Sequence, residues 1–236
     1  MTTAGANVYV NGSHGVGGTV LAVNGSTGEV LWTAQDPSGP SNTALAVTSD
    51  AVCLSTGCSW TFAYARGTGK PLWSYVNDNC LGGLDGTPAY HNGRLYIRHG
   101  VPTNEIFDGK TGQQIAPFAA DPMPAFDGKE GFFLNGSTLT AQTVNTRQML
   151  WSVTGDGTLS TAPFVVDHVV YEGTGSGYLY ALNETTGAVL DKAAVGASVP
   201  APNDDGNFIL SGMVAGQGII VVPTGSGIVA LAGTQP

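Results

Sequence analysis

The sequence predicts an all-β fold, a β-propeller built of four-stranded antiparallel blades, and three observations support this. The 236 residues include 35 Gly and 13 Pro but only 11% charged side chains, which is typical of short strands joined by many turns. Residues 19–32 carry an alternating apolar run, a polar turn closed by Gly28 and a second apolar run, which is the pattern of a β-hairpin. Near copies of this hairpin recur at the length of one propeller blade, about 40–45 residues.

The copies divide the chain into six expected blades. The sixth copy, at residues 227–233, stops before a fourth strand. The turns of the first five close at Gly28, Gly69, Gly112, Arg147 and Gly187, which differ by 41, 43, 35 and 40 positions. The shortest interval arises because Asn135-Gly136 joins two strands of the fourth blade almost directly. We expect one domain over residues 1–236, with blades at about 1–36, 37–78, 79–121, 122–156, 157–198 and 199–236.

Each blade is expected to contain four strands in the same order. The first strand of the first blade is expected at residues 2–6. The third blade has apolar runs near residues 88–90, 94–98, 105–108 and 113–118. The fifth blade shows the order most clearly, at residues 161–166, 169–173, 178–183 and 188–193.

The recurring residues of the hairpin have structural explanations. The side-chain oxygen of Asn24 can accept a hydrogen bond from a backbone N–H two residues on, and the closing glycine accepts a positive φ. A tryptophan follows four residues after the closing position in three copies. Since a sheet with two apolar faces must bury both, we expect these rings to wedge between neighbouring blades. They are Trp32, Trp73 and Trp151.

This Asn/Asp-x-x-Thr-Gly-x-x-x-Trp pattern, as at residues 24–32, resembles the pyrroloquinoline-quinone-like (PQQ-like) propeller repeat. That family includes quinoprotein alcohol dehydrogenases, outer-membrane assembly lipoproteins and many bacterial secreted or cell-surface proteins. The resemblance covers essentially the whole chain. It implies the fold rather than an activity, because the motif belongs to the scaffold.

Familiar members of the family have seven or eight blades and an export signal. The resemblance therefore implies an extracytoplasmic protein, periplasmic, secreted or at the cell surface, although residues 1–6 lack the pattern of a signal peptide. Two explanations of the short sixth copy stay open: a three-stranded sixth blade, or a chain that is part of a longer propeller. An open arc of blades would expose two blade faces and favour self-association.

The quinoprotein dehydrogenases of this family carry a disulfide between adjacent cysteines, and a Ca²⁺ held by Glu, Asn and Asp beside the quinone. This chain has no Cys-Cys pair, and no Glu falls in the loops that join one blade to the next. PQQ is therefore not an expected cofactor, whereas Ca²⁺ stays a candidate ligand.

Charge and hydropathy exclude other classes of partner. The net charge is −9 with only eight Lys plus Arg, so the chain offers no basic stripe for nucleic acid. No apolar run approaches the about 20 residues that cross a bilayer, so membrane insertion is not expected.

The loops from the fourth strand of one blade to the first strand of the next converge on one propeller face, where function usually resides. Every such loop carries an aspartate, and this acidic face could bind a cation or attract a polyhydroxy or protein ligand. Aspartate is also simply a favoured loop residue. Arg98 adds to a polar concentration in the third blade. The aspartates are Asp36, Asp78, Asp85, Asp121, Asp156, Asp204 and Asp205.

The cysteines and histidines give weaker indications. A Cys58–Cys80 disulfide would fasten a long loop of one blade and imply an oxidising compartment, with Cys53–Cys58 as the competing pair. Otherwise Cys53 is expected to be a small buried side chain. The four histidines form no paired ligand motif, so no metal site is predicted from them.

Two functions from different classes remain. The first is a non-catalytic binding or scaffolding propeller of a bacterial envelope or secreted protein, with a protein, glycan or cation bound on the acidic loop face. The second is an enzyme on the same scaffold, either a divergent PQQ-dependent oxidoreductase or a hydrolase or lyase without a recognisable motif. An enzyme should show convergent polar groups around a pocket.

Overall fold

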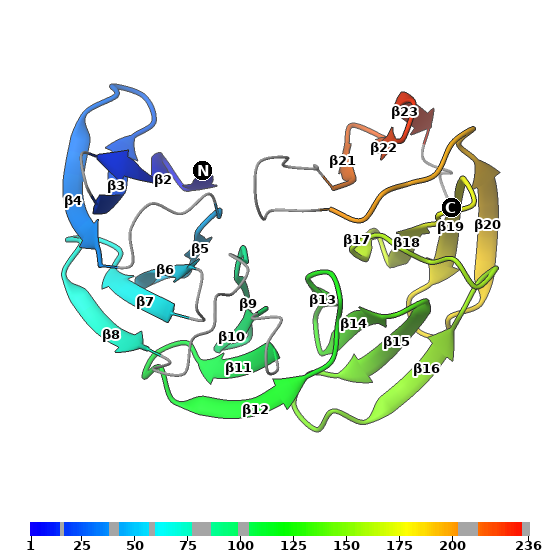
Figure 1. Cartoon of the computed structure of the whole chain (residues 1–236), viewed down its shortest axis with the longest axis horizontal. Helices are drawn as coiled ribbons and strands as arrows, with labels where there is room; N and C mark the ends of the chain where they lie inside the picture. Colours follow the sequence, from blue (N-terminus) through cyan, green and yellow to red (C-terminus); the bar gives the residue numbers. More distant parts are fainter. Residues whose placement is uncertain are drawn as a thin grey trace. The chain divides into compact units, whose positions relative to one another are not determined.

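A computed structural model of the chain describes residues 1–14, 17–37, 43–56, 60–76, 86–98, 104–202 and 212–232. These residues form strands and turns, without a helix. They fall into two compact units: unit 1 runs from Met1 to Phe118, and unit 2 contains the described residues from Ala119 onward. Each unit is a set of antiparallel sheets, one per repeat, and we call the sheets blades 1 to 6 in chain order (Figure 1).

Unit 1 contains three four-stranded blades, in which each strand pairs with the next along the chain. Blade 1 is β1 (Thr2–Ala4), β2 (Asn7–His14), β3 (Gly17–Asn24) and β4 (Val30–Asp36). Blade 2 is β5 (Ala46–Val47), β6 (Ala51–Thr56), β7 (Trp60–Ala65) and β8 (Pro71–Tyr75). Blade 3 is β9 (Ala89–His91), β10 (Arg94–Ile97), β11 (Asn104–Asp108) and β12 (Gln114–Phe118).

Unit 2 contains two further four-stranded blades and one with three strands among its described residues. Blade 4 is β13 (Ala125–Asp127), β14 (Glu130–Asn135), β15 (Thr138–Thr143) and β16 (Met149–Val153). Blade 5 is β17 (Phe164–Val166), β18 (Val169–Gly173), β19 (Tyr178–Asn183) and β20 (Val189–Ala194). Blade 6 is β21 (Val214–Gly216), β22 (Ile219–Thr224) and β23 (Gly227–Ala232). The expected fold class is therefore confirmed, while the single-domain boundary stays a prediction.

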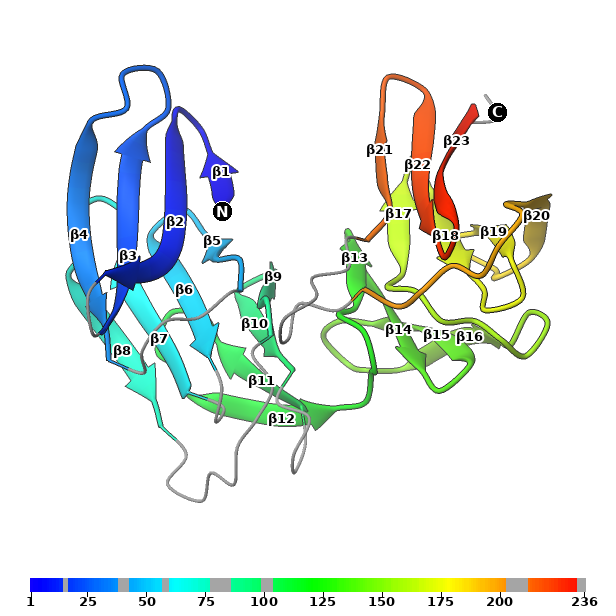
Figure 2. The ribbon, with the colours of Figure 1, turned by 45° about the horizontal axis from the view of Figure 1, so that its top comes forward.

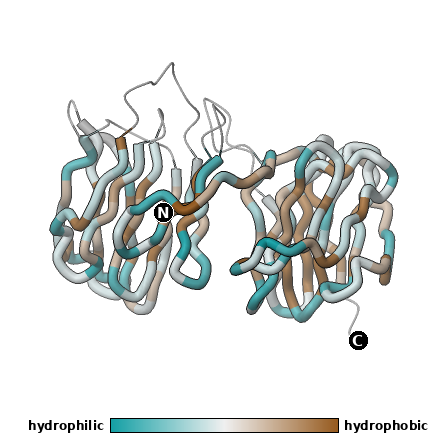
Figure 3. The backbone as a smooth tube through the Cα atoms, turned by 90° about the horizontal axis from the view of Figure 1, so that it is seen from below, coloured by the Kyte–Doolittle hydropathy of each residue, from teal (hydrophilic) through white to brown (hydrophobic). Residues whose placement is uncertain are grey.

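Within each unit the first strands of successive blades lie next to one another. β1 contacts β5 and β5 contacts β9 in unit 1, and β13 contacts β17 in unit 2. The fourth strands form the outer edge of each unit in Figures 1 and 2. Hydrophobic residues run through the strands and hydrophilic residues gather at the turns, because strand faces are buried between blades (Figure 3).

The turn between the third and fourth strands is held as the sequence predicts. In blade 1 the Oδ1 of Asn24 accepts hydrogen bonds from the N–H groups of Ser26 at 2.9 Å and Thr27 at 3.1 Å. Gly28 closes the turn with φ of +73°. Blade 4 departs from this rule, since Arg147 takes the closing position with φ of 57°.

The three tryptophans of the repeat pack between blades, as the sequence predicts. The ring of Trp32 lies against Gly69 of blade 2, where a Cβ atom would come within 2.5 Å of the ring. Its Nε1 donates to the carbonyl of Arg66 at 2.8 Å. Trp151 repeats both contacts with blade 5, against Gly187 and the carbonyl of Glu184. Each tryptophan therefore requires two features of the next blade: a glycine that leaves room for its ring, and a backbone carbonyl that accepts a hydrogen bond from its Nε1.

Every fourth strand of blades 1 to 5 begins with a β-bulge. One residue of the fourth strand is left without a partner on the third strand, just before the tryptophan position. This extra residue is always a leucine or isoleucine that is 41% to 57% exposed. The bulge residues are Leu31, Leu72, Ile115, Leu150 and Leu190.

Each blade has two distinct ends. We call the end that carries the first-to-second and third-to-fourth strand turns the turn end, and the opposite end the loop end. At the turn end the residue after the third strand donates its N–H to a carbonyl of the first-to-second turn, as Gly25 does to Ala6 at 2.8 Å. Val144 and Glu184 make the same bond to Lys129 and His168.

Candidate metal centre

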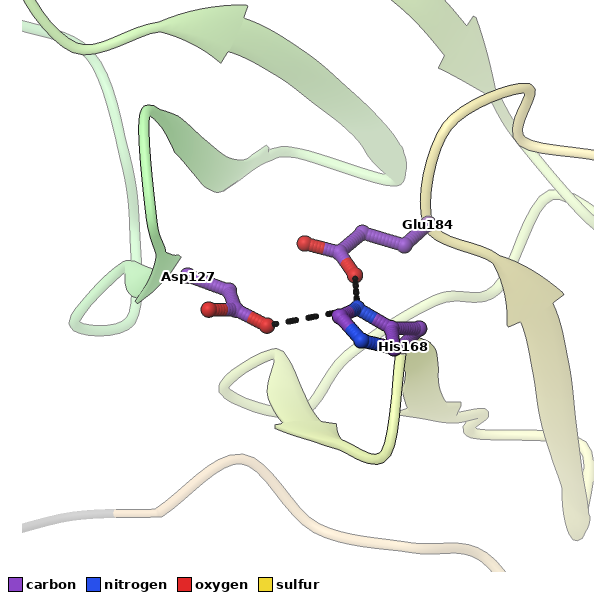
Figure 4. Close-up of side chains that lie close together, drawn as sticks. All are labelled: Asp127, His168 and Glu184. Carbon is purple, nitrogen blue, oxygen red and sulfur yellow. Dashed lines mark hydrogen bonds and ion pairs between the residues drawn. The ribbon is translucent and has the colours of Figure 1, made fainter.

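Three turns of unit 2 bring Asp127, His168 and Glu184 together at the turn end of blades 4 and 5 (Figure 4). Asp127 is the last residue of β13 in blade 4. His168 lies in the turn between β17 and β18, and Glu184 follows β19, both in blade 5. The three side chains therefore come from neighbouring blades and from positions far apart in the sequence.

The backbone conformation of two turns places His168 and Glu184 at the turn end of blade 5. Asp167 and His168 form a two-residue turn with φ of 50° and 61°, a left-handed conformation that suits a tight hairpin. Two hydrogen bonds fix the backbone of Glu184: its N–H donates to the carbonyl of His168 at 3.3 Å, and its carbonyl accepts from the side-chain Nε1 of Trp151 at 2.7 Å. The inter-blade tryptophan thus also positions this carboxylate.

The ligand atoms lie close together. Nδ1 of His168 is 2.9 Å from Oε2 of Glu184 and 3.8 Å from Oδ2 of Asp127. One ligand atom from each residue falls within 4.8 Å of the other two. The Glu184 side chain is only 10% exposed, whereas that of His168 is 87% exposed. The group is therefore accessible from solvent on one side.

Negative charge dominates the electrostatics. The hydrogen bond from His168 to Glu184, and then the charges of Glu184 and Asp127, raise the pKa of the imidazole. Desolvation, and then the charges of Glu184 and Asp127, raise the pKa of Glu130, which begins β14. The Oε2 atom of Glu130 is buried without a hydrogen-bond partner among the described residues. A cation at this place would relieve the repulsion.

None of these three residues is predicted from the sequence to have a role. No short motif joins them, because each comes from a different turn. A signal was nevertheless available: alignment of the repeats places all three at the turn end of adjacent blades. Only the packing of blade 4 on blade 5, which depends on Trp151 and Gly187, brings them within reach of one another.

The sequence-predicted acidic face is only partly described. Asp36 ends β4 and is 1% exposed, so it is buried rather than displayed to solvent. Asp121, in the loop between blades 3 and 4, is exposed and accepts a hydrogen bond from the N–H of Gly136 in blade 4. Arg98 directly follows β10 and is partly exposed. Asp78, Asp85, Asp204 and Asp205 lie outside the described residues.

Asp156 belongs to a hydroxyl-rich network at the loop end of blade 5. Its carboxylate accepts hydrogen bonds from the N–H and Oγ1 of Thr158, at 3.0 and 2.7 Å, and from Oγ of Ser176. Desolvation opposes ionisation of Asp156, but these hydrogen bonds outweigh it and lower the pKa of the carboxyl group. The structure thus shows this predicted residue holding two loops of one blade together.

Glu172 of β18 is a buried acid with no predicted role in the sequence. Its side chain is fully buried, and Oε1 accepts from the N–H and Oγ1 of Thr161 at 2.9 and 2.8 Å. Its Oε2 has no hydrogen-bond partner among the residues that the structure describes. Burial raises the pKa of Glu172 to about 8. Its contacts to Thr161 make it a structural acid of blade 5, whose burial affects the stability of the fold.

The cysteine predictions are tested only at one position. Cys53 is buried in β6 with a free thiol, as expected, and burial raises its pKa to about 12. Cys58 and Cys80 lie outside the described residues, so their pairing stays a prediction.

The repeated sheets and inter-blade tryptophans define a β-propeller protein. Solved structures agree with this fold. A computationally designed protein, Ika8, matches with a TM-score of 0.74 at 17% identity, over 98% of this chain and 69% of that one. BamB from Moraxella catarrhalis matches with a TM-score of 0.58 at 13% identity, over 98% of this chain and 80% of that one.

A dehydrogenase shares the fold as well. The quinohemoprotein alcohol dehydrogenase from Comamonas testosteroni matches with a TM-score of 0.65 at 15% identity, over 93% of this chain. This chain covers 50% of that enzyme's length. Because these sequence identities are low, the structural similarity is evidence of a shared fold and of nothing more. No curated protein sequence matches the chain.

A family model identifies the relationship more closely. The model described as outer membrane protein assembly factor BamB matches residues 1–76 and 59–227. The chain therefore belongs to this family of PQQ-like propellers, as the repeat pattern predicts. Among the described residues, no helix is both long and apolar enough to cross a membrane.

Proposed function

We propose that this chain is a non-catalytic binding propeller of a bacterial envelope or secreted protein, and that its ligand is a protein. The observation that carries the proposal is the family match, which extends over residues 1–76 and 59–227 and is described as an outer membrane protein assembly factor. The same membership supports an extracytoplasmic location.

The proposed contact surface is the loop end of the blades. Asp121 and Asp156 are exposed there, and the net charge of the chain is −9, so the surface favours a ligand with basic or hydroxyl-rich segments. In each case, hydrogen bonds donated by residues of the following blade hold the carboxylate in place. Such preorganisation lowers the entropic cost of binding.

Binding of unfolded outer-membrane protein segments tests the proposal directly. Fluorescence anisotropy of labelled strand peptides, taken from an outer-membrane β-barrel and carrying Lys or Arg, should show saturable binding to the full chain. The double variant Asp121→Asn with Asp156→Asn should weaken binding, whereas Glu29→Gln, on a turn at the opposite end, should not. Equal binding by all three proteins would overturn the assignment of this surface.

The competing enzyme function has its own experiment. Incubation of the full chain with PQQ and Ca²⁺, followed by absorbance and dye-linked alcohol oxidation, should show neither a bound-quinone spectrum nor turnover. Stoichiometric quinone binding with dye reduction would replace the binding propeller with an oxidoreductase. Light scattering on the same samples measures self-association, which we expect to be concentration-dependent.

A further inference from the structure

The turn end of blade 2 contains a residue equivalent to Glu184. Arg66 follows β7 as Glu184 follows β19, and its N–H donates to the carbonyl of Asp50 at 2.8 Å in the first-to-second turn. Its own carbonyl accepts from Trp32 Nε1, as that of Glu184 accepts from Trp151 Nε1. The two residues therefore stand at the same place of the repeat, each beside a docked tryptophan.

At blade 2 the side chain at this place is a cation that joins two blades. The guanidinium of Arg66 donates to the carbonyl of Ala4 at 3.1 Å and to the hydroxyl of Tyr9 at 3.0 Å, both in blade 1. It also donates to the carbonyl of Thr48 in its own blade at 3.2 Å. Ala4 ends β1 as Asp127 ends β13. The cation of Arg66 thus reaches the position that Asp127 occupies in blade 4.

At blade 5 the same place carries the opposite charge. Glu184 faces Asp127 across the junction of blades 4 and 5, with His168 between them (Figure 4). The buried Oε2 of Glu130, next to Asp127 along the first hairpin, is without a hydrogen-bond partner among the described residues. Arg66 connects blades 1 and 2 at this place of the repeat. At the equivalent place between blades 4 and 5 the side chains include the acids Asp127, Glu130 and Glu184.

We propose that Asp127, His168 and Glu184 bind one divalent first-row transition-metal ion, with Zn²⁺ as the best fit, which joins blades 4 and 5 as Arg66 joins blades 1 and 2. An imidazole nitrogen and two carboxylate oxygens are ordinary zinc ligands, and a tetrahedral ion leaves a fourth position to water. Ca²⁺ prefers six to eight oxygen ligands, so it fits this group less well.

The observed separations suit such an ion. Zinc–ligand bonds of about 2.0–2.2 Å place tetrahedral ligand atoms about 3.3–3.6 Å apart. The distances from His168 Nδ1 to the two carboxylates, 2.9 and 3.8 Å, lie on either side of that value. On binding, the Nδ1 proton that bonds to Glu184 leaves, to solvent or to Nε2 of the same ring, and the freed lone pair of Nδ1 coordinates the metal. The backbone bonds at Glu184 keep one ligand fixed throughout.

Calorimetric titration of the untagged full chain with Zn²⁺ tests the site. One saturable site is expected, and Asp127→Asn and His168→Asn should each weaken it by about tenfold or more. Asn is chosen at position 168 because it accepts the left-handed backbone that His168 adopts, with φ of 61°. Glu29→Gln removes a carboxylate from the equivalent turn of blade 1 and should leave binding unchanged.

Glu184→Arg provides the sharpest variant, because it gives blade 5 the residue of blade 2. It should fold, judged by circular dichroism, lose Zn²⁺ binding and show no rise in Tm on addition of Zn²⁺, whereas the Tm of the wild type rises. Imidazole NMR of the wild type, which needs no variant, should show zinc shifting the signals of His168 and of no other histidine. Absent zinc binding, binding that survives His168→Asn, or equal affinity for Ca²⁺ would each overturn the proposal.

Discussion

Blades 2 and 5 are copies of one repeat that differ by charge at three equivalent positions. Register places Leu54 of β6 opposite Phe62 and Glu172 of β18 opposite Tyr180, at the same step of the hairpin. Arg66 and Glu184 follow the third strands. Trp73 and Asp191 occupy the same position of the fourth strands, opposite Ala63 and Ala181.

At these three positions blade 5 has a carboxyl group where blade 2 has an aliphatic side chain, a cation or an aromatic ring. The shared residues, the turns and the inter-blade glycine, make both copies fold alike. The strands pair alike in both blades, and among the differing residues the buried Glu172 carries a desolvation penalty when it ionises. Local departures of this kind are expected where a repeat has acquired a role beyond the fold.

The largest expected effect is at the tryptophan position of blade 2. Trp73→Asp, which copies blade 5, should destabilise the protein by about 3–5 kcal/mol, because it leaves a cavity beside Gly112 and an unused carbonyl at Gly109. Urea unfolding measures the loss. Trp73→Phe keeps a ring but no N–H and should lose less; a Trp73→Asp protein as stable as the wild type would contradict wedge packing.

The second effect is the pH dependence that Glu172 brings. Its folded-state pKa is raised from 4.5 to about 8, so the folded protein holds a proton that the unfolded chain releases. This contribution to stability is therefore fully present below pH 4.5 and is lost as pH rises through about 8.

Glu172→Leu, which copies Leu54, should remove this slope. At pH 9 the variant is expected to be more stable than the wild type, and at pH 5 equal or less stable, since the donors of Thr161 lose their acceptor. Urea unfolding at pH 5 and pH 9 measures the free energy of unfolding of both proteins and shows whether their order changes. Parallel pH profiles for the two proteins would contradict a buried, protonated Glu172.

The fold was predictable from sequence because its signals are local. Asn24, Gly28 and the following tryptophan form a turn whose hydrogen bonds span only a few residues, and repetition multiplied that signal. The group of Asp127, His168 and Glu184 was not predictable in this way, because these residues meet only through the packing of two blades. Burial is likewise a property of the packed sheets: Glu172 sits in a correctly predicted strand, yet nothing local reveals that its side chain is enclosed.

The smallest effect concerns the missing tryptophan of blade 5. Asp191 lines a pocket of about 120 Å³ together with Tyr171, Leu179 and Ile220, between blades 5 and 6. Asp191→Trp, which copies Trp73, should fill part of it and raise the free energy of unfolding by about 1 kcal/mol. Differential scanning calorimetry measures the change, with Asp191→Asn as a control for the lost charge. A lower Tm for the tryptophan variant would show that the space between blades 5 and 6 differs in shape from the space that Trp73 fills between blades 2 and 3.

The bulges of the fourth strands affect the tendency of the chain to aggregate at high concentration. They lie at Leu31, Leu72, Ile115, Leu150 and Leu190. A protein made of near-identical sheets presents the same outer edge many times, and each edge could template addition of a strand from another molecule. A bulge strengthens the local twist and bends the strand, so the edge is not a flat ladder. If the bulges were replaced by regular pairing, the outer edges of the blades would be flatter. We expect strands of different molecules then to pair edge to edge and to form fibres.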